Sequence, residues 1–288
     1  MAKSKVGGSR AYIRGRIGAD VYSIGKDGKG TRQQVVRSLA EQVSNPRTES
    51  QMFGRMVMST VMQAVSAMSP IIDHSFDGLP KGQPSISEFI RRNYALVKAD
   101  AKAHPAAGNA FGLNKYQEKG ILPGAYVVSD GSAVKPAALS IQGNTLTVAL
   151  TAATMTVGGL KAALGITADG YMTAIVVGAS AGFCFARVKV STSLPDATAI
   201  SAENVASLFS IESNVAVTPS IYQNNINFEL AVDDNDKTYG VIVSDKVDGA
   251  WIHSACTLAG ALEETQGSDV ALPTYPTGSN QFLNGGDL

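Results

Sequence analysis

The spacing of hydrophobic residues changes along this chain, and the change divides it into regions. Between residues 48 and 103, apolar side chains recur every three or four positions, as on one face of an α-helix. After Gly120, apolar and polar residues alternate, as in a half-buried β-strand. The pattern predicts an α+β fold: an amino-terminal β-hairpin arm (1–46), a helical region (47–119), an antiparallel β-sandwich-like domain (120–262) and an extended carboxy-terminal tail (263–288).

The amino-terminal arm is predicted to be a basic hairpin. Ala11 to Ser23 can form one strand, Asp27-Gly28 is a strong tight-turn signal, and Thr31 to Arg37 can return as the second strand. Because a two-stranded ribbon alone is marginally stable in water, we expect a neighbour to order it, either its own β domain or another subunit. The candidate contacts to a neighbouring subunit or to nucleic acid are Arg10, Arg14, Arg16, Arg32 and Arg37.

A methionine-rich helix is predicted to follow the arm. Thr48 is a good N-cap with Gln51 completing a capping box, and the helix is expected to end near Met68, before Pro70. Its apolar stripe is either ordinary core or an adaptable contact surface between subunits, because methionine side chains adjust to irregular partners. The methionines that are candidates for subunit packing are Met52, Met56 and Met62.

A second helix is predicted from Ser85, an N-cap with Glu88 completing a second capping box, to His104-Pro105. Its basic residues form either a solvated face or part of a basic surface. Residues 103–114, which contain several helix breakers, are expected to be the joint to the β-rich region. The apolar face is expected to consist of Ile86, Ile90, Tyr94, Val97 and Ala101, with Phe89 beside it.

Seven strands and two short helices are predicted after residue 120, which favours an antiparallel sandwich. The short helices are expected near Val157–Leu164 and Ala202–Phe209, and the polar tail is either disordered or held by a neighbour. The predicted strands are Ala125–Ser129, Thr145–Leu150, Met172–Val177, Phe183–Val190, Ile226–Val232, Tyr239–Ser244 and Ala250–Cys256.

Composition places the chain among globular proteins, with 288 residues, 44% of them hydrophobic and 17% charged. The polar start and the lack of a long apolar run lead us to expect a protein that is made in a cytoplasm and does not enter membranes. Cys184 and Cys256 lie in apolar surroundings and are expected to be buried thiols, a disulfide being the alternative.

The net charge of zero hides a strong asymmetry. Residues 1–119 contain 18 of the 24 basic residues but only 9 of the 24 acidic ones, a net charge of +9, and residues 120–288 carry the balancing −9. Such a split can drive head-to-tail docking between copies or direct a basic end towards nucleic acid. The alternative is two solvated faces of unlike sign.

No motif of the sequence indicates catalysis, a cofactor or a metal. The glycines of the arm fit neither a phosphate-binding loop nor a dinucleotide fingerprint. The acidic cluster Asp233, Asp234 and Asp236 fails the calcium-loop pattern at its sixth and twelfth positions, and is interpreted as a hairpin turn. Ser244, Asp245 and His253 lack a nucleophile motif. We therefore expect no enzyme.

The opening of the chain has a Gly-punctuated strand, a Gly-Lys turn, a strand ending in Arg and an Asn-Pro-Arg-Thr helix start. The residues of this pattern are Gly15, Gly18, Gly28, Lys29, Arg37, Asn45, Pro46, Arg47, Thr48, Gln51 and Arg55. In these features the chain resembles an uncharacterised family of Bacteroidota bacteria and their phages. The resemblance covers roughly the first sixty residues and implies a phage-associated structural protein with a β-sandwich, without implying a site.

The function that these features favour is a virion structural protein, a coat, capsid-type or tail-associated subunit, which self-assembles through its terminal arms. Its expected partners are other copies of itself, as a homo-oligomer, other virion proteins and, as a further candidate, packaged nucleic acid. It would be located in the virion after synthesis in the host cytoplasm. The alternative is a β-sandwich that binds carbohydrate or a cell surface, for which the candidate aromatics are Trp251, Tyr222 and Tyr239. Of these, Trp251 is expected in the core rather than at the surface.

Overall fold

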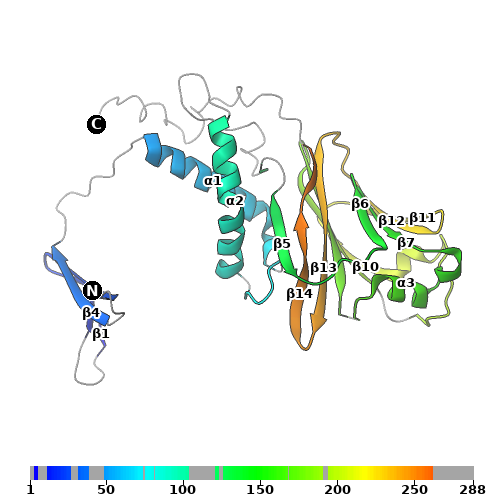
Figure 1. Cartoon of the computed structure of the whole chain (residues 1–288), viewed down its shortest axis with the longest axis horizontal. Coiled ribbons are helices and arrows are strands. Elements are labelled where there is room, and N and C mark those ends of the chain that lie inside the picture. The colour runs from blue at the N-terminus through cyan, green and yellow to red at the C-terminus, as the bar shows by residue number, and fades with distance from the viewer. Residues whose placement is uncertain are drawn as a thin grey trace. The chain divides into compact units, whose positions relative to one another are not determined.

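Figure 1 shows the fold of the chain as a computed structural model. The chain separates into two units, Met1–Arg47 and Thr48–Leu288. The predicted α+β class is confirmed, and every pair of named strands in the described residues is antiparallel. The structure describes residues 3–5, 12–26, 32–38, 49–73, 75–80, 82–103, 121–122, 126–167, 169–190 and 194–261.

The first unit is a four-stranded sheet in the order β1-β2-β3-β4. The segment predicted as one strand, Ala11–Ser23, instead turns at Gly18, which has a φ of +59° that favours glycine. The single-strand prediction was therefore wrong, while the antiparallel return towards Arg37 is confirmed. The turn residues 27–30 lie outside the described residues. The strands are β1 (Lys3–Lys5), β2 (Tyr12–Ile17), β3 (Asp20–Lys26) and β4 (Arg32–Ser38).

Helix α1 (Glu49–Ile72) continues through Pro70, so its predicted end near Met68 was wrong. Proline removes one helical hydrogen bond, but the two residues that follow it, Ile71 and Ile72, are 2% and 0% exposed. Burial of these side chains in the core offsets the missing bond, which a local breaker rule does not take into account. The proposed cap Thr48 lies outside the described residues.

Helix α2 (Gln83–Ala103) begins two residues before the predicted N-cap. Ser85 is consequently buried in the first turn, where its hydroxyl donates to the carbonyl of Pro80 at 3.1 Å. The buried stripe is rotated relative to the predicted face, since Ile86, Ile90 and Tyr94 are only partly buried. The fully buried positions are Ser85, Phe89, Asn93, Val97 and Ala101.

The second unit contains two β-sheets. The large sheet has the order β10-β9-β8-β13-β14-β5, with β15 also paired to β13, and the small one has the order β11-β12-β7-β6. The large sheet consists of β5 (Val127–Ser132), β8 (Tyr171–Gly178), β9 (Gly182–Val190), β10 (Phe209–Ser213), β13 (Lys237–Val247), β14 (Ala250–Thr257) and β15 (Ala259–Ala261). The small sheet consists of β6 (Leu139–Gln142), β7 (Thr145–Ala149), β11 (Val217–Tyr222) and β12 (Asn225–Leu230).

All seven predicted strands are present, as β5, β7, β8, β9, β12, β13 and β14. The predicted helix Val157–Leu164 is α3, which starts at its N-cap Thr156 and ends at Gly165. Around the second predicted short helix there is only a 3₁₀ turn, Val205–Leu208. A further 3₁₀ turn, Ala152–Thr154, precedes α3. The tail 263–288 and most of the joint at 103–114 lie outside the described residues.

The large sheet lies between two hydrophobic cores, with the helix pair on one face and the small sheet on the other (Figure 1). Strand β8 shows this most clearly, because successive strand residues point to opposite faces. Ile175 and Val177 pack with α1 and α2, whereas Ala174 and Val176 pack with the small sheet. The molecule thus has a helical layer on a β-sandwich, and the helices share one unit with the sheets.

Candidate functional site

The sheet of the first unit has two different faces. Residues directly opposite each other on neighbouring antiparallel strands share a face, and Tyr22 lies opposite Val36 on β4 and Gly15 on β2. Ile17 lies two positions after Gly15 on β2 and therefore belongs to the same face. Ile17 and Val36 are 48% and 51% exposed. We call this the apolar arm face, defined by Ile17, Tyr22, Ile24 and Val36. No residue of this sheet whose burial the structure describes is buried.

The opposite side of the same sheet carries a row in which Val21 is flanked by Arg16 and Arg37. Both arginines are exposed, and Arg16 donates through Nε to the carbonyl of Gly18 at 2.9 Å. Val35, on this cationic arm face, is 37% exposed. The register therefore brings together two of the five predicted contact arginines. Arg14 and Arg32 lie in β2 and β4, and Arg10 lies outside the described residues.

The methionines proposed for subunit packing separate into two groups. Met56 is 1% exposed and belongs to the chain's own core beneath the helices, so that it is not available to a partner. Met62 is 42% exposed, and Met58 is 41% exposed. Met52 lies in α1, outside the residues whose burial is described. Any contact surface on α1 therefore involves its outer methionines.

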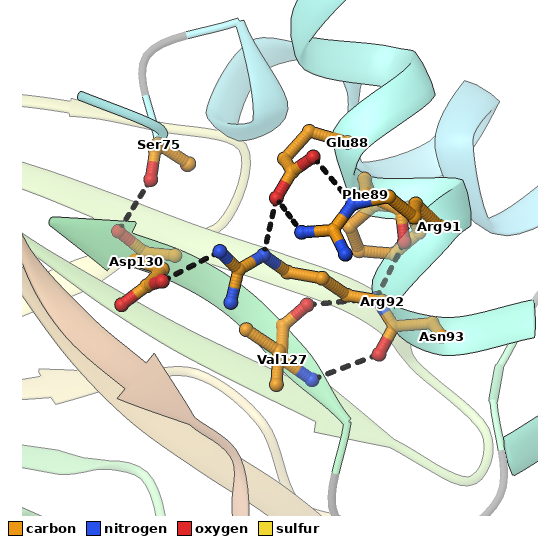
Figure 2. Close-up of polar contacts among 9 residues, drawn as sticks. Ser75, Glu88, Phe89, Arg91, Arg92, Asn93, Val127 and Asp130 are labelled. Carbon is orange, nitrogen blue, oxygen red and sulfur yellow. Dashed lines mark hydrogen bonds and ion pairs between the residues drawn. The ribbon is translucent and has the colours of Figure 1, made fainter. Parts of the chain in front are cut away.

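A polar joint attaches α2 to the edge strand β5 (Figure 2). The Asn93 amide donates to the carbonyl of Val127 at 2.8 Å and to that of Phe89 at 3.0 Å, and its Oδ1 accepts from the N–H of Val127 at 2.9 Å. Asn93 thus satisfies both backbone groups of one β5 residue, as a further strand would. This contact holds the helix against the edge of the sheet.

An ion network surrounds Asn93. Arg92 bonds to Glu88 at 2.8 Å and to Asp130 on β5 at 2.6 Å (Figure 2). Glu88 also accepts two hydrogen bonds from Arg91. The Arg91 hydrogen bonds, followed by those of Arg92, lower the pKa of Glu88 to about 2. Arg92 therefore belongs to the attachment of α2 rather than to a free basic surface.

Asp77, which lies between α1 and α2, joins the end of β5 to the middle of β14. Its Oδ1 accepts from the N–H of His253 at 2.6 Å, and its Oδ2 accepts from the N–H and hydroxyl of Ser132, both at 2.7 Å. Gly131 permits this approach, since a Cβ there would lie 2.2 Å from Asp77 Oδ1. The hydrogen-bond partners of Asp77 lie more than fifty residues away along the chain, so no local pattern indicates them.

Ser244 and His253 do meet in the structure, as cross-strand neighbours on β13 and β14. The Ser244 hydroxyl lies 3.0 Å from His253 Nδ1, but the two residues are only 1% and 3% exposed. The Asp245 carboxylate accepts instead from the N–H and hydroxyl of Thr167. This arrangement is a buried structural hydrogen bond, because a substrate has no access to the hydroxyl.

The acidic cluster at 233–236 is not a hairpin turn, which corrects its interpretation from sequence. It lies in the connection from β12 of the small sheet to β13 of the large sheet. Asp234 accepts from the N–H groups of Ser180 and Ala181 at 3.0 and 2.8 Å. Burial raises the pKa of Asp234, but these N–H groups outweigh it and hold the pKa below its ordinary value.

Trp251 is 38% exposed, so its expected place in the core was wrong. Its ring centroid lies 5.4 Å from that of Tyr171 on β8, with the planes at 54°. The Arg187 guanidinium lies 5.2 Å from the Tyr171 centroid, and Arg187 also bonds to Glu212 at 2.8 Å and to the carbonyl of Pro70 at 3.0 Å. We call Arg187, Tyr171 and Trp251 the aromatic row.

The other two aromatics proposed for a binding module lie elsewhere. Tyr222 is 65% exposed and ends β11, next to the turn residues Gln223 and Asn224. Tyr239 is partly buried and packs against the core between the two sheets. No ring contact joins either of these tyrosines to the aromatic row within the described part of the chain.

The expectation of two buried thiols is confirmed, because Cys184 and Cys256 are free and buried. Burial, assisted by the charge of Asp234, raises the pKa of Cys184 above its ordinary value. Burial also raises the pKa of Cys256 to about 11. Both are therefore protonated at neutral pH and are poor nucleophiles.

Within the described ranges, no group of three or more His, Cys, Asp or Glu side chains is arranged to hold a metal ion. No helix of the described residues combines the length and the hydropathy needed to cross a bilayer. Comparisons of the chain with protein-family models, curated proteins and solved structures gave no match.

Proposed function

We propose that this chain is a structural subunit of a phage virion, of the coat, capsid or tail-associated kind, and that it self-assembles through its amino-terminal arm. The observation that carries the proposal is the arm sheet, in which no residue of described burial is buried. A sheet needs an apolar face packed against another layer for independent stability. The missing layer is supplied here by a second copy.

Hydrophobic burial gives the assembly its direction. Fully burying an isoleucine or valine side chain is worth roughly 1.5–3 kcal/mol. Ile17 and Val36 are about half exposed, so covering them is worth on the order of 1 kcal/mol each. Tyr22 and Ile24 lie on the same face and add to the covered area. The apolar arm face is therefore the contact surface, and the cationic arm face stays outside it.

Charge supports the same assembly. Residues 1–47 contain ten basic and three acidic residues, whereas residues 120–288 have a net charge of −9. Opposite charges on separate parts of the chain favour contacts between copies and raise their association rate. The resemblance of the first sixty residues to a family of bacteria and their phages agrees with such a role and is the reason for proposing a virion as its setting.

The test is sedimentation of the full-length protein over a range of concentration and salt. The wild type should form multimers, and the double variant Ile17→Asp/Val36→Asp should sediment as a monomer, because a buried carboxylate without a partner is strongly unfavourable. The matched control is Val21→Asp/Val35→Asp, which places the same two charges on the cationic arm face and should still assemble. A wild-type monomer under all conditions would refute the proposal.

The cationic arm face suggests packaged nucleic acid as a further partner. Binding to DNA through Arg16 and Arg37 would weaken steeply with added salt, since each neutralised phosphate releases counterions. Retention on DNA that does not change with salt would exclude the arm from this role.

A further inference from the structure

The aromatic row lies where the helix-facing side of the large sheet emerges from beneath the helices. Ile175 and Ile242 on this side are 0% and 2% exposed because α1 and α2 cover them. Further along the strands, the hydrogen bond from Arg187 to Pro70 marks the end of α1. Beyond it, Tyr171 is partly exposed and Trp251 is 38% exposed. A Trp ring thus faces solvent beside the part of this side of the sheet that the helices cover.

Basic residues gather around these two rings. Residues 120–288 contain only six Lys and Arg residues, and three of them, Arg187, Lys189 and Lys246, share this side of the sheet. Lys246 is exposed and lies directly opposite Trp251 in the β13–β14 register. Lys189 is two positions from Arg187 on β9 and therefore points to the same side. The patch is positive within a region whose net charge is −9.

Two fixed carboxylates complete the surroundings. Glu212 bonds to Arg187 at 2.8 Å with its side chain 67% exposed, and Asp169 lies 3.9 Å from Lys189. No acidic partner within ion-pair distance is found for Lys246 among the described residues. The patch therefore offers a flat apolar ring, an available cation beside it, and carboxylate oxygens that can accept hydrogen bonds from hydroxyl groups.

We propose that the aromatic row with Lys189 and Lys246 is a binding site for a carboxylate-bearing glycan. A pyranose ring presents an apolar C–H face, which packs on Trp251, and hydroxyl groups, which donate to Glu212 or Asp169. The sugar carboxylate is held by Lys246 in a charge-assisted hydrogen bond. This function is additional to self-assembly, because the residues belong to the second unit and not to the arm.

The mixed charge of the patch favours a glycan over single-stranded nucleic acid. Nucleic acid carries a phosphate on every nucleotide and is bound by aromatic residues within a groove of continuous positive charge. A single-stranded DNA backbone has no hydroxyl groups that could donate to Glu212 or Asp169, whereas every sugar of a glycan has several. The aromatic row also supplies two rings tilted at 54° rather than a series of stacking platforms.

The experiment uses the fact that Trp251 is the only tryptophan of the chain, so that tryptophan fluorescence of the full-length protein reports on this site alone. Oligogalacturonate is the acidic probe, a malto-oligosaccharide is the neutral one and oligothymidylate is the nucleic-acid probe. Oligogalacturonate should change the Trp251 emission saturably. Lys246→Ala should weaken its affinity by about tenfold, which corresponds to the loss of one charge-assisted contact.

Two further variants separate the site from general effects. Trp251→Ala, followed by calorimetry and checked for folding by circular dichroism, should lose binding. Tyr222→Ala removes a more exposed ring elsewhere, 65% against 38%, and should bind as the wild type does. The proposal is overturned if oligogalacturonate does not bind, if the neutral probe binds as tightly, or if only oligothymidylate binds. These outcomes do not depend on whether the protein sediments as a monomer or a multimer.

Discussion

At the scale of single residues, the polar side chains buried between α2 and the sheet are the part of the structure that the sequence concealed. Asn93 occupies a core position of α2, where the hydrophobic pattern placed Tyr94 instead. An asparagine in a helix is normally taken for a solvent-facing residue, and its partner Val127 is 34 positions away. No local pattern reports such a bond, so the true buried face of α2 could not be predicted.

Replacing Asn93 by leucine should therefore destabilise the protein although it makes the helix face more apolar. The N–H and carbonyl of Val127 would lose their partners in a partly buried site, which costs up to about 1–3 kcal/mol for each group. The measurement is the free energy of unfolding in urea. Lys98→Leu adds the same side chain at an exposed position of α2 and should change the free energy of unfolding little. If Asn93→Leu were as stable as the wild type, the joint would not hold the helix.

At the scale of elements, the predicted strands succeeded where the pattern was long and failed at the margins of the sheets. Four strands of the second unit were not predicted. Of these, β6, β10 and β11 each form the edge of a sheet, and β15 is a three-residue strand paired with β13. Edge strands are short and irregular, and β11 even contains Pro219, which edge strands tolerate because one side of their backbone has no strand partner. A central strand such as β8, in contrast, carries a continuous apolar run that is visible in sequence.

The attachment of α2 should also weaken in acid. Because hydrogen bonds from Arg91 and then Arg92 lower the pKa of Glu88 from 4.5 to about 2, its ionised form stabilises the fold. A group with a depressed folded-state pKa contributes fully above its unfolded pKa and loses that contribution as the pH falls. The loss is expected between pH 4.5 and about 2, and amounts to about 1 kcal/mol or less because Arg91 is largely exposed to solvent.

The check is the unfolding free energy of wild type and Glu88→Gln measured across that pH range. The difference between them should be largest near neutral pH and should shrink towards pH 2. Glu229→Gln, which removes an exposed carboxylate of β12, serves as the control and should run parallel to the wild type. A constant difference at every pH would show that the Glu88 ion network does not contribute to stability.

At the scale of the whole molecule, the sequence predicted the order of the regions but not how they combine. The helical pattern and the strand pattern each identify an apolar face, and neither indicates which faces pack together. Here the helices cover the large sheet, which has apolar residues on both sides. The aromatic row was likewise hidden, because Tyr171 and Trp251 are eighty positions apart in the chain and meet only through the pairing of β8 with β13 and of β13 with β14.

Deleting residues 1–47 should separate assembly from stability. The second unit contains both hydrophobic cores, so the shortened protein should keep the unfolding midpoint of the wild-type subunit. It should, however, not form the multimers that we expect of the wild type in sedimentation, because the apolar arm face is gone. Differential scanning calorimetry at low protein concentration measures the unfolding midpoint, and sedimentation measures assembly. A large fall in the midpoint would mean that the arm is a structural part of the subunit body.

Strand β8 contributes side chains to both hydrophobic cores, so the two cores share one backbone. A methyl group added at Ala174 overpacks the core between the two sheets, and a methyl group removed at Ile175 leaves a void in the core beneath the helices. Both changes act on the same backbone hydrogen bonds between β8 and β13. Looser packing in one core is therefore expected to disturb the other. In the proposed assembly, the second unit would then act as a rigid body. Differences in geometry between neighbouring copies would have to be taken up outside the two cores.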